Sequence, residues 1–392
     1  MDEKNILETW YRNPFEILDL FFSNGEHPIK KINGELILAE GNTAKQVLAN
    51  KEGLFTEHSD FFTSSHGVFG PREKQQEISL HAKQFLTHYL KRNKSTLKEK
   101  VTQAFTLESQ WPDTGNWLLY HHLEFALLNK NSPKHLRKSM KQVVKRAVLS
   151  DAKDNYNEIS RKLFRFSIKV ALSKEIKKRR STLNVTVEPS DLLDIIIKAT
   201  PDNLKTPAII EIFFSFIFSI AGSVGFLLGW SIYMLASNNH AKTFEKAKPS
   251  WIVLETLRLW PVAWNLSRKP AVNHTIAGVN VTPQDTVIVC PYAVHRNPNN
   301  WKQATTFNPF RWQRESKNHL QHKKETKSQN NTFIPFGWGE HICPAAHLSM
   351  QLVEHILTLL TPYQLTVLHQ EAHPPASAAL APPQFILQSI IK

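Results

Sequence analysis

One long uncharged stretch constrains the fold of this chain more than any other feature of its sequence. Residues 212–235 contain no charged side chain, and as a helix these 24 residues would extend roughly 36 Å, enough to cross the core of a bilayer. The centre of a large globular protein requires the same kind of helix, apolar on every side. Glu211 directly precedes the stretch, and Ser215, Ser219 and Ser223 interrupt it. Hydropathy alone therefore leaves both a membrane span and a buried core helix open.

The composition is that of a folded, globular chain. Its 392 residues are 41% hydrophobic and 21% charged, which excludes an intrinsically disordered chain. The two cysteines, Cys290 and Cys343, are too few for a disulfide scaffold or for a multi-cysteine zinc or iron–sulfur site. The sequence starts with charged residues and not with the apolar segment of a secretory signal. We therefore expect a cytoplasmic protein.

Positive charge exceeds negative charge, with 48 Lys and Arg against 34 Asp and Glu and a formal net charge of +14. Basic residues cluster in segments 134–146 and 174–180. Such clusters are either solvated helix faces or a surface for an acidic protein partner, because complementary charge steers association. No nucleic-acid recognition motif accompanies them, so a nucleic acid is not an expected partner.

The periodicity of apolar residues predicts a mostly helical chain with a small β region. Helical patterns dominate residues 43–180. Asn33-Gly34 lies between the alternating apolar residues of segment 29–38, which is the strongest short signal for a β-hairpin. Residues 275–292 are strand-like, and the polar residues 313–331 predict a surface loop.

The second cysteine lies in a pattern that is unusual for a buried, inert thiol. Gly337 and Gly339 permit a tight turn before it, and Pro344 suits the first position of a helix. Apolar residues then recur four positions apart over residues 348–360. The sulfur of Cys343 would lie at a helix N-terminus, where backbone N–H groups and the helix dipole favour the thiolate. A single thiolate in such a place is what an axial bond to iron needs.

Four elements in a characteristic order resemble those of the cytochrome P450 superfamily, the haem-thiolate monooxygenases. The haem loop of that family, F-x-x-G-x-R-x-C-x-G, is matched at Phe336, Gly339 and Cys343. The three elements before it are similar to residues 255–261 for the E-x-x-R helix, residues 292–298 (Tyr-Ala-Val-His-Arg-Asn-Pro), and residues 307–312 for the F-x-P-E-R-F segment. Together, the order and spacing are far more specific than any single element.

The resemblance implies a mainly α fold with a small β region, in a single haem-enclosing domain over residues 1–392. Residues 212–235 then correspond to the family's central helix, which crosses the distal face of the haem. This assignment favours the core-helix interpretation over the membrane span. Anchored members of the family carry an apolar helix at the N-terminus, so no stable membrane anchor is expected here.

The resemblance also implies a set of haem-binding residues. They are Phe336, Gly339, His341, Cys343, Ala345, Arg268 and Arg72. Cys343 would be the axial ligand of haem b, with Phe336 beside the sulfur. His341, at a position where most members have an arginine, and Arg268 would bind the haem propionates, with Arg72 a weaker candidate.

Glu255, Arg258 and Arg311 resemble the structural triad that ties the cysteine loop to the core of the family. We expect them to be buried and mutually paired, so that removing one partner is costly. After the cysteine, Pro344 and Ala345 replace an N–H-bearing residue and a glycine. The proline removes one backbone donor near the sulfur.

The central helix departs from the family at its catalytic positions. Typical members read A/G-G-x-D/E-T there, and the acid and the alcohol relay protons to bound dioxygen. The corresponding positions in this chain are Ala221, Gly222, Ser223, Val224 and Gly225. Protons would then come from ordered water, from a polar group of the substrate, or from Ser223. Otherwise the enzyme would use peroxide, or would rearrange or dehydrate an oxygenated substrate.

The predicted substrate pocket is mostly apolar, which suits a lipophilic substrate such as a terpenoid, a fatty acid or a polyketide. By position in the family it is lined by residues 378–380 and by Ile217, Phe218, Ile220, Val262, Ala263, Trp264, Asn265 and Leu266. No flavin or nicotinamide fingerprint is present, so a ferredoxin or flavodoxin and its reductase would supply electrons. We expect a monooxygenase. The alternatives are a peroxide-dependent or redox-neutral haem-thiolate enzyme and a non-catalytic haem-binding protein.

Overall fold

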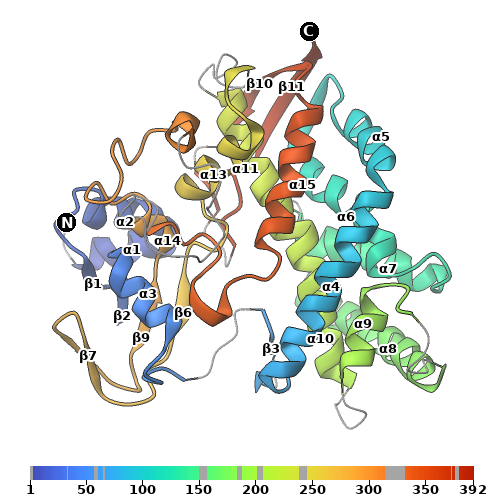
Figure 1. The fold of residues 1–392 in the computed structure, drawn as a ribbon, viewed down its shortest axis with the longest axis horizontal. Helices are drawn as coiled ribbons and strands as arrows, with labels where there is room; N and C mark the ends of the chain where they lie inside the picture. The colour runs from blue at the N-terminus through green and yellow to red at the C-terminus, as the bar shows by residue number, and fades with distance from the viewer. Residues whose placement is uncertain are drawn as a thin grey trace. The chain divides into compact units, whose positions relative to one another are not determined.

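The computed structural model divides into two compact units, each built from separate stretches of the chain. The first unit comprises Met1–His58, Gly229–Pro383 and Lys392, and the second comprises Ser59–Leu228 and Gln384–Ile391. The described residues are 3–32, 34–56, 61–64, 67–149, 157–182, 188–200, 206–237, 245–313, 332–371, 373–375 and 379–392. Both units are shown in Figure 1. The expected single domain over residues 1–392 stays a prediction.

A four-stranded sheet in the first unit confirms the predicted hairpin. Its strands, in the order β1-β2-β9-β6, are β1 (Ile29–Ile32), β2 (Glu35–Leu38), β9 (Thr286–Val289) and β6 (Leu266–Arg268). β1 pairs antiparallel with β2, with Ile29 opposite Leu38. The strand-like region is also confirmed, because β7 (His274–Ile276) and β8 (Val279–Val281) form a second hairpin before β9. The predicted loop over residues 313–331 lies almost wholly outside the described residues.

Helices of the first unit precede and follow these strands along the chain. They are α1 (Glu3–Arg12), α2 (Pro14–Phe22), α3 (Gly41–Ala49), α13 (Pro249–Leu259), α14 (Pro291–Val294) and α15 (Ala346–Leu359). Two short 3₁₀ turns, η4 (Pro309–Trp312) and η6 (Gly339–His341), and the strand β10 (Tyr363–Gln370) complete this unit. α13 packs against both α15 and η4.

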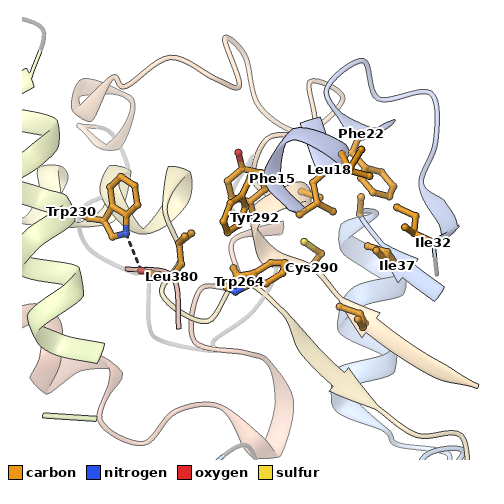
Figure 2. Close-up of a cluster of buried hydrophobic side chains, with 14 residues drawn as sticks. Phe15, Leu18, Phe22, Ile32, Ile37, Trp230, Trp264, Cys290, Tyr292 and Leu380 are labelled. Atoms are coloured by element: carbon orange, nitrogen blue, oxygen red, sulfur yellow. Dashed lines mark hydrogen bonds between the residues drawn. The ribbon is translucent and has the colours of Figure 1, made fainter. Parts of the chain in front are cut away.

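A buried apolar cluster in the first unit joins the N-terminal helices to the sheet. Figure 2 shows Cys290 and Trp264 in this cluster, among side chains from α2 and β2. The ring centres of Phe15 and Trp264 are 5.0 Å apart in an edge-to-face contact. The indole N–H of Trp230 donates to the carbonyl oxygen of Leu380 at 2.9 Å. This cluster fixes the C-terminal segment near residue 380 to the core of the unit.

The second unit is almost entirely helical. Its elements are β3 (Thr63–Ser64), β4 (Gly67–Val68), α4 (Arg72–Arg92), α5 (Lys94–Ala104), β5 (Glu108–Trp111), α6 (Asp113–Leu127), α7 (Lys134–Ala147), α8 (Glu158–Thr182), α9 (Leu192–Ala199), α10 (Thr206–Ile217) and β11 (Phe385–Ile391). β5 pairs antiparallel with β11, the last strand of the chain. The predictions of a mainly α fold and of helices over residues 43–180 are thus confirmed.

The predicted central helix is present, with one wider turn at its middle. The π-helical turn η2 (Phe218–Val224) separates α10 from α11 (Gly225–Ala236). The whole helix, Thr206–Ala236, is long and apolar enough to cross a membrane, as the core helix of a globular protein can also be. In its most apolar 18-residue segment, 61% is buried. Such π-helical turns are frequent at functional sites.

A buried asparagine of α6 holds the π-helical turn. Nδ2 of Asn116 donates to the carbonyl oxygen of Ala221 at 2.6 Å, and Asn116 is completely buried. A Cβ atom built on Gly225 would lie 2.4 Å from Nδ2 of Asn116 and 3.0 Å from its Cα. The central helix thus approaches α6 too closely for any side chain at position 225, which explains the glycine there.

We expect Gly225→Thr, which restores the family's alcohol, to destabilise the protein. The new Cβ would overlap the backbone of Asn116, and overpacking of this kind costs about 1–3 kcal/mol or more. The free energy of unfolding in urea measures the effect. Val224→Thr is the matched control, because Val224 is only half-buried and valine and threonine have nearly the same shape. Equal stability of the two variants would contradict this account.

Candidate active site

The chain before Cys343 folds back on itself in a tight loop. Gly337 and Gly339 have positive φ angles of 78° and 73°, as the predicted turn requires. The N–H of Cys343 donates to the carbonyl oxygen of Phe336 at 3.0 Å, which closes the loop. Phe336 and Cys343 are both half-buried.

Helix α3 supports this loop from one side. A Cβ atom on Gly339 would lie 2.9 Å from the Cα of Ala49, so the two backbones are in direct contact. Nζ of Lys45 lies 3.7 Å from the centre of the Trp338 ring, a cation–π geometry. Burial lowers the pKa of Lys45 to about 8. The loop is therefore held against a helix by backbone contact and by a partly desolvated cation.

The sulfur of Cys343 lies at the N-terminus of α15, although this helix begins later than predicted. Its first residue is Ala346 and its N-cap is Ala345, so the prediction that Pro344 starts the helix is wrong. Pro344 is an exposed turn residue. The backbone N–H groups of Ala345 and Ala346 bind the sulfur and lower the pKa of the thiol, but burial raises it more. The helix end alone therefore does not produce the predicted thiolate, and a bound cation would be needed to stabilise it.

Cys290, the other cysteine, has a purely structural environment. Its side chain is completely buried in the apolar cluster of Figure 2, and burial raises the pKa of its thiol to about 12. A thiol that stays protonated and has no access to a ligand cannot bind a metal. Of the two cysteines, only Cys343 is a candidate ligand.

The predicted triad is assembled around one buried carboxylate. Glu255 and Arg258 of α13 are both 0% exposed and form a bidentate pair, with N–O distances of 2.8 and 3.0 Å. Nε of Arg311 donates to the same carboxylate at 3.0 Å. The backbone N–H of Asn308 and the indole N–H of Trp312 complete its shell, each at 2.9 Å. Glu255 therefore accepts five hydrogen bonds, which is how a buried charge is stabilised.

The remaining N–H groups of Arg258 bind the backbone that follows α14. They donate to the carbonyl oxygens of His295, Ala304 and Thr306. Arg311 similarly donates to the carbonyl of Lys302 at 3.0 Å. The triad thus fixes the irregular segment between α14 and η4. The three residues that the motifs grouped are in contact in the structure.

His295 connects the triad to the cysteine loop, a role that the sequence did not predict. The ring is completely buried, and burial and the charge of Arg258 lower its pKa to about 3, so it is neutral. Its Nδ1–H donates to the carbonyl oxygen of Arg258 at 3.1 Å, and Nε2 accepts the N–H of Ile334 at 2.9 Å. A carbonyl and an N–H on opposite sides of the ring allow only this tautomer. The available signal was the position of His295 inside a matched element, residues 292–298.

The residues expected to bind the haem propionates are distributed over both units. Arg268 of β6 is 3% exposed, and its Nη1 donates to the carbonyl of Ser267 at 2.8 Å. His341 ends η6 and is half-buried. Both belong to the unit that carries Cys343. Arg72 begins α4 and belongs to the other unit.

The expected catalytic positions lie in η2 and at the start of α11. Ala221, Gly222 and Gly225 are buried, whereas Ser223 and Val224 are half-buried. Position 225 is committed to packing on α6. Ser223 is the one polar side chain among these five positions, and it is half-buried.

The predicted pocket residues divide into buried and accessible members. Trp264 and Leu266 belong to two hydrophobic core clusters, whereas Val262, Ala263 and Asn265 are half-buried. In the second unit Ile217 and Ile220 are buried, and Phe218 is 39% exposed. The N–H of Leu380 donates to the carbonyl of Val262 at 2.8 Å, which brings two of the predicted lining segments together. Ala378 lies outside the described residues.

Comparison with known proteins supports the same assignment. Residues 250–388, which carry the triad, His295 and Cys343, match the family model described as Cytochrome P450. A cholesterol 22-monohydroxylase of Trigonella foenum-graecum is 30% identical over 218 residues, 48% of this chain and 44% of that protein. The 3,9-dihydroxypterocarpan 6A-monooxygenase of Glycine max is 33% identical over 109 residues, 28% of this chain and 21% of that protein. The matched parts span less than half of the length of these relatives.

Solved structures show the same fold over nearly the whole chain. Cytochrome P450 CYP109Q5 from Chondromyces apiculatus has a TM-score of 0.71 at 13% identity, covering 98% of this chain and 97% of that one. CYP109E1 from Bacillus megaterium, solved in complex with corticosterone, has a TM-score of 0.70 at 17% identity, covering 96% and 98%. The family model thus falls on residues 250–388, the segment with the triad and the cysteine loop, and the chain has the fold of cytochrome P450 structures over nearly its whole length.

Proposed function

We propose that this chain binds haem b through the thiolate of Cys343 and oxidises a lipophilic small molecule as a monooxygenase. The observation that carries the proposal is the cysteine loop, closed by the hydrogen bond from Cys343 to Phe336. Its sulfur receives two backbone N–H groups, and the residue as a whole is half-buried. The loop is fastened to a buried ion pair through His295.

The residues around Cys343 fit the cofactor of this superfamily, haem b on an axial cysteine thiolate. Within the described residues, no group of three or more His, Cys, Asp or Glu side chains could hold a metal ion. A single thiolate suits an iron whose other ligands come from a macrocycle. Arg268 and His341 supply N–H donors in the same unit and would pair with the propionates. When bound, the haem supplies the iron centre at which oxygen or peroxide is activated.

Proton delivery would use a row of hydroxyl groups on the central helix. Ser215, Ser219 and Ser223 recur four residues apart, and all three are half-buried, so they share one face of the helix. The face that carries Ala221 and Gly225 is occupied by α6. We propose that Ser223, with ordered water, takes the place of the missing acid and alcohol.

A second candidate is a peroxide-dependent or redox-neutral reaction at the same haem. The observation that favours it is the close contact at Gly225, which leaves no room for the family's alcohol. An enzyme that uses peroxide needs no electrons from a redox partner and no relay that delivers protons to dioxygen, so the absence of the acid and the alcohol would not hinder it. The two candidates differ in whether reduced ferredoxin or flavodoxin, with its reductase, supports product formation.

The names of the similar proteins support a lipophilic substrate. Two curated relatives are named for acting on cholesterol and on a dihydroxypterocarpan, and a similar structure was solved with corticosterone. All three molecules are rigid and polycyclic. The half-buried Val262 and Ala263 and the exposed Phe218 are the predicted lining residues available for such contacts.

We expect Cys343→Ser to abolish the thiolate signature of the haem. Wild-type protein, reduced and exposed to carbon monoxide, should show the red-shifted Soret band of a thiolate-bound iron. The variant should lose that band while keeping its helical circular dichroism. Cys290→Ser, at the other cysteine, serves as the control and should keep the band if it folds. A wild-type protein that binds no haem, or binds it without this band, would refute the proposal.

We expect His295→Phe to loosen the cysteine loop in a folded protein. Phenylalanine preserves the ring packing on Phe333 but leaves the Ile334 N–H and the Arg258 carbonyl unpaired, which costs about 1–3 kcal/mol for each group. The fraction of carbon monoxide complex with the thiolate band should fall, and the remainder should absorb at shorter wavelength. His347→Phe, on the exposed face of α15, should leave the spectrum unchanged. An unaltered spectrum in His295→Phe would show that the loop does not depend on this bridge.

We expect Ser223→Ala to divert electrons from product to peroxide. Electrons would be supplied by ferredoxin and its reductase, with a substrate chosen from a steroid and fatty-acid panel by its spin-state shift. Removing one proton donor typically costs 10²–10⁴-fold in the step it assists, so the share of electrons recovered in product should drop. Ser231→Ala, at a buried position further along the helix, is the control. If the share of electrons recovered in product is unchanged in Ser223→Ala, proton delivery depends on water or on the substrate and not on Ser223.

A further inference from the structure

Nearly all of the net positive charge of this protein lies on two neighbouring helices of the second unit. α7 has six Lys and Arg and no Asp or Glu, and α8 has nine Lys and Arg and two Glu. These two helices therefore supply all but one unit of the formal net charge of +14. α7 packs beside α8 (Figure 1).

The outer face of α8 also carries an apolar stripe that the described residues do not cover. Ile159, Leu163, Phe166 and Val170 are 70%, 66%, 68% and 52% exposed. Their spacing of four, three and four residues places them on one line along the helix. The core is contacted by a different set of α8 residues, Ile168, Leu172, Glu175, Ile176 and Arg179, which are buried. The helix thus has an inner face that packs and an outer face that does not.

Lysines flank and extend this apolar stripe. Lys162 and Lys169 lie beside it, 73% and 49% exposed in their side chains. Lys174 and Lys177 follow Val170 at the next positions of the same spacing, and both are exposed. A line of large apolar side chains bordered by lysines is the composition of helices that lie in the boundary between lipid headgroups and acyl chains.

The charge decides which partner suits this stripe. A second copy of the chain would bring two strongly positive faces together, which opposes association. An uncharged surface would gain nothing from the lysines. An anionic lipid surface satisfies both features, because its headgroups attract the lysines and its fluid interior accepts a protruding apolar ridge.

We propose that the outer face of α8, with the basic face of α7, binds reversibly to membranes that contain anionic lipids. Leu163 and Phe166, at the centre of the stripe, would enter the acyl boundary. The lysines would remain at the level of the headgroups. This surface does not include the cysteine loop, and its lysine Lys169 lies 3.9 Å from the carboxylate of Glu211 on the central helix.

Flotation with lipid vesicles tests the proposal on the full-length, haem-loaded protein. Vesicles of phosphatidylcholine alone are compared with vesicles that also contain phosphatidylglycerol. We expect wild-type protein to float with the anionic vesicles, and to be released by salt because the charges are screened. The double variant Leu163→Ser/Phe166→Ser should bind at least about tenfold more weakly, since two large apolar side chains no longer leave water. Lys174→Gln/Lys177→Gln should weaken binding to the anionic vesicles only.

Matched controls keep the test decisive. Leu20→Ser/Leu80→Ser removes two apolar side chains of similar exposure, 54% each, from other helices, and it should bind like wild type. An unchanged Soret band shows that each variant folds. Wild-type protein that ignores anionic vesicles would overturn the proposal, and so would equal losses in both apolar double variants. Loss of a dimer, or of binding to an acidic ferredoxin, with vesicle binding intact in Leu163→Ser/Phe166→Ser would assign the stripe to a protein partner instead.

Discussion

The carboxylate of Glu255 is the point on which the first unit depends. It is completely buried, and a buried carboxylate is tolerated only when its charge is paired and its oxygen lone pairs are occupied. Here five N–H groups from α13 and from residues 308–312 occupy them. Arg258, the cation of the pair, donates its remaining hydrogen bonds to backbone carbonyl oxygens. An irregular segment far from α13 in sequence thereby acquires a defined path without any regular secondary structure.

The same interaction reaches the cysteine loop in two further steps. The carbonyl of Arg258 accepts the N–H of the His295 ring, and that ring accepts the N–H of Ile334. Ile334 in turn accepts the N–H of Gly337, at the first positive φ of the loop. The position of Cys343 is therefore set from within the core, and not by the surface turn in which it lies. This explains why the histidine between the triad and the cysteine loop is neutral and buried, since a charged ring would donate from both nitrogens and could not accept the N–H of Ile334.

The sequence predicted the elements whose signals are local. The hairpin around Gly34, the central helix and the positive-φ turns before Cys343 depend on residues close together in the chain, and all three are present. The triad was found because its members match a known motif. The predicted start of α15 was wrong because proline also suits the turn before a helix, which is where Pro344 lies. The π-helical turn and the role of Asn116 could not be predicted, because the hydrogen bond that holds them joins residues 105 positions apart.

The contact between Asn116 and the central helix also limits the chemistry that this protein can perform. One face of the helix packs on α6: the carbonyl oxygen of Ala221 accepts a hydrogen bond from Asn116, and Gly225 has no space for a side chain. The resemblance places the family's alcohol at position 225, where a threonine would add bulk to a packed interface. A polar group for proton transfer must therefore come from a different face, where Ser219 and Ser223 are half-buried. The packing of the two helices thus accounts for the glycine at position 225, and it does not involve the face on which we propose that Ser223 acts.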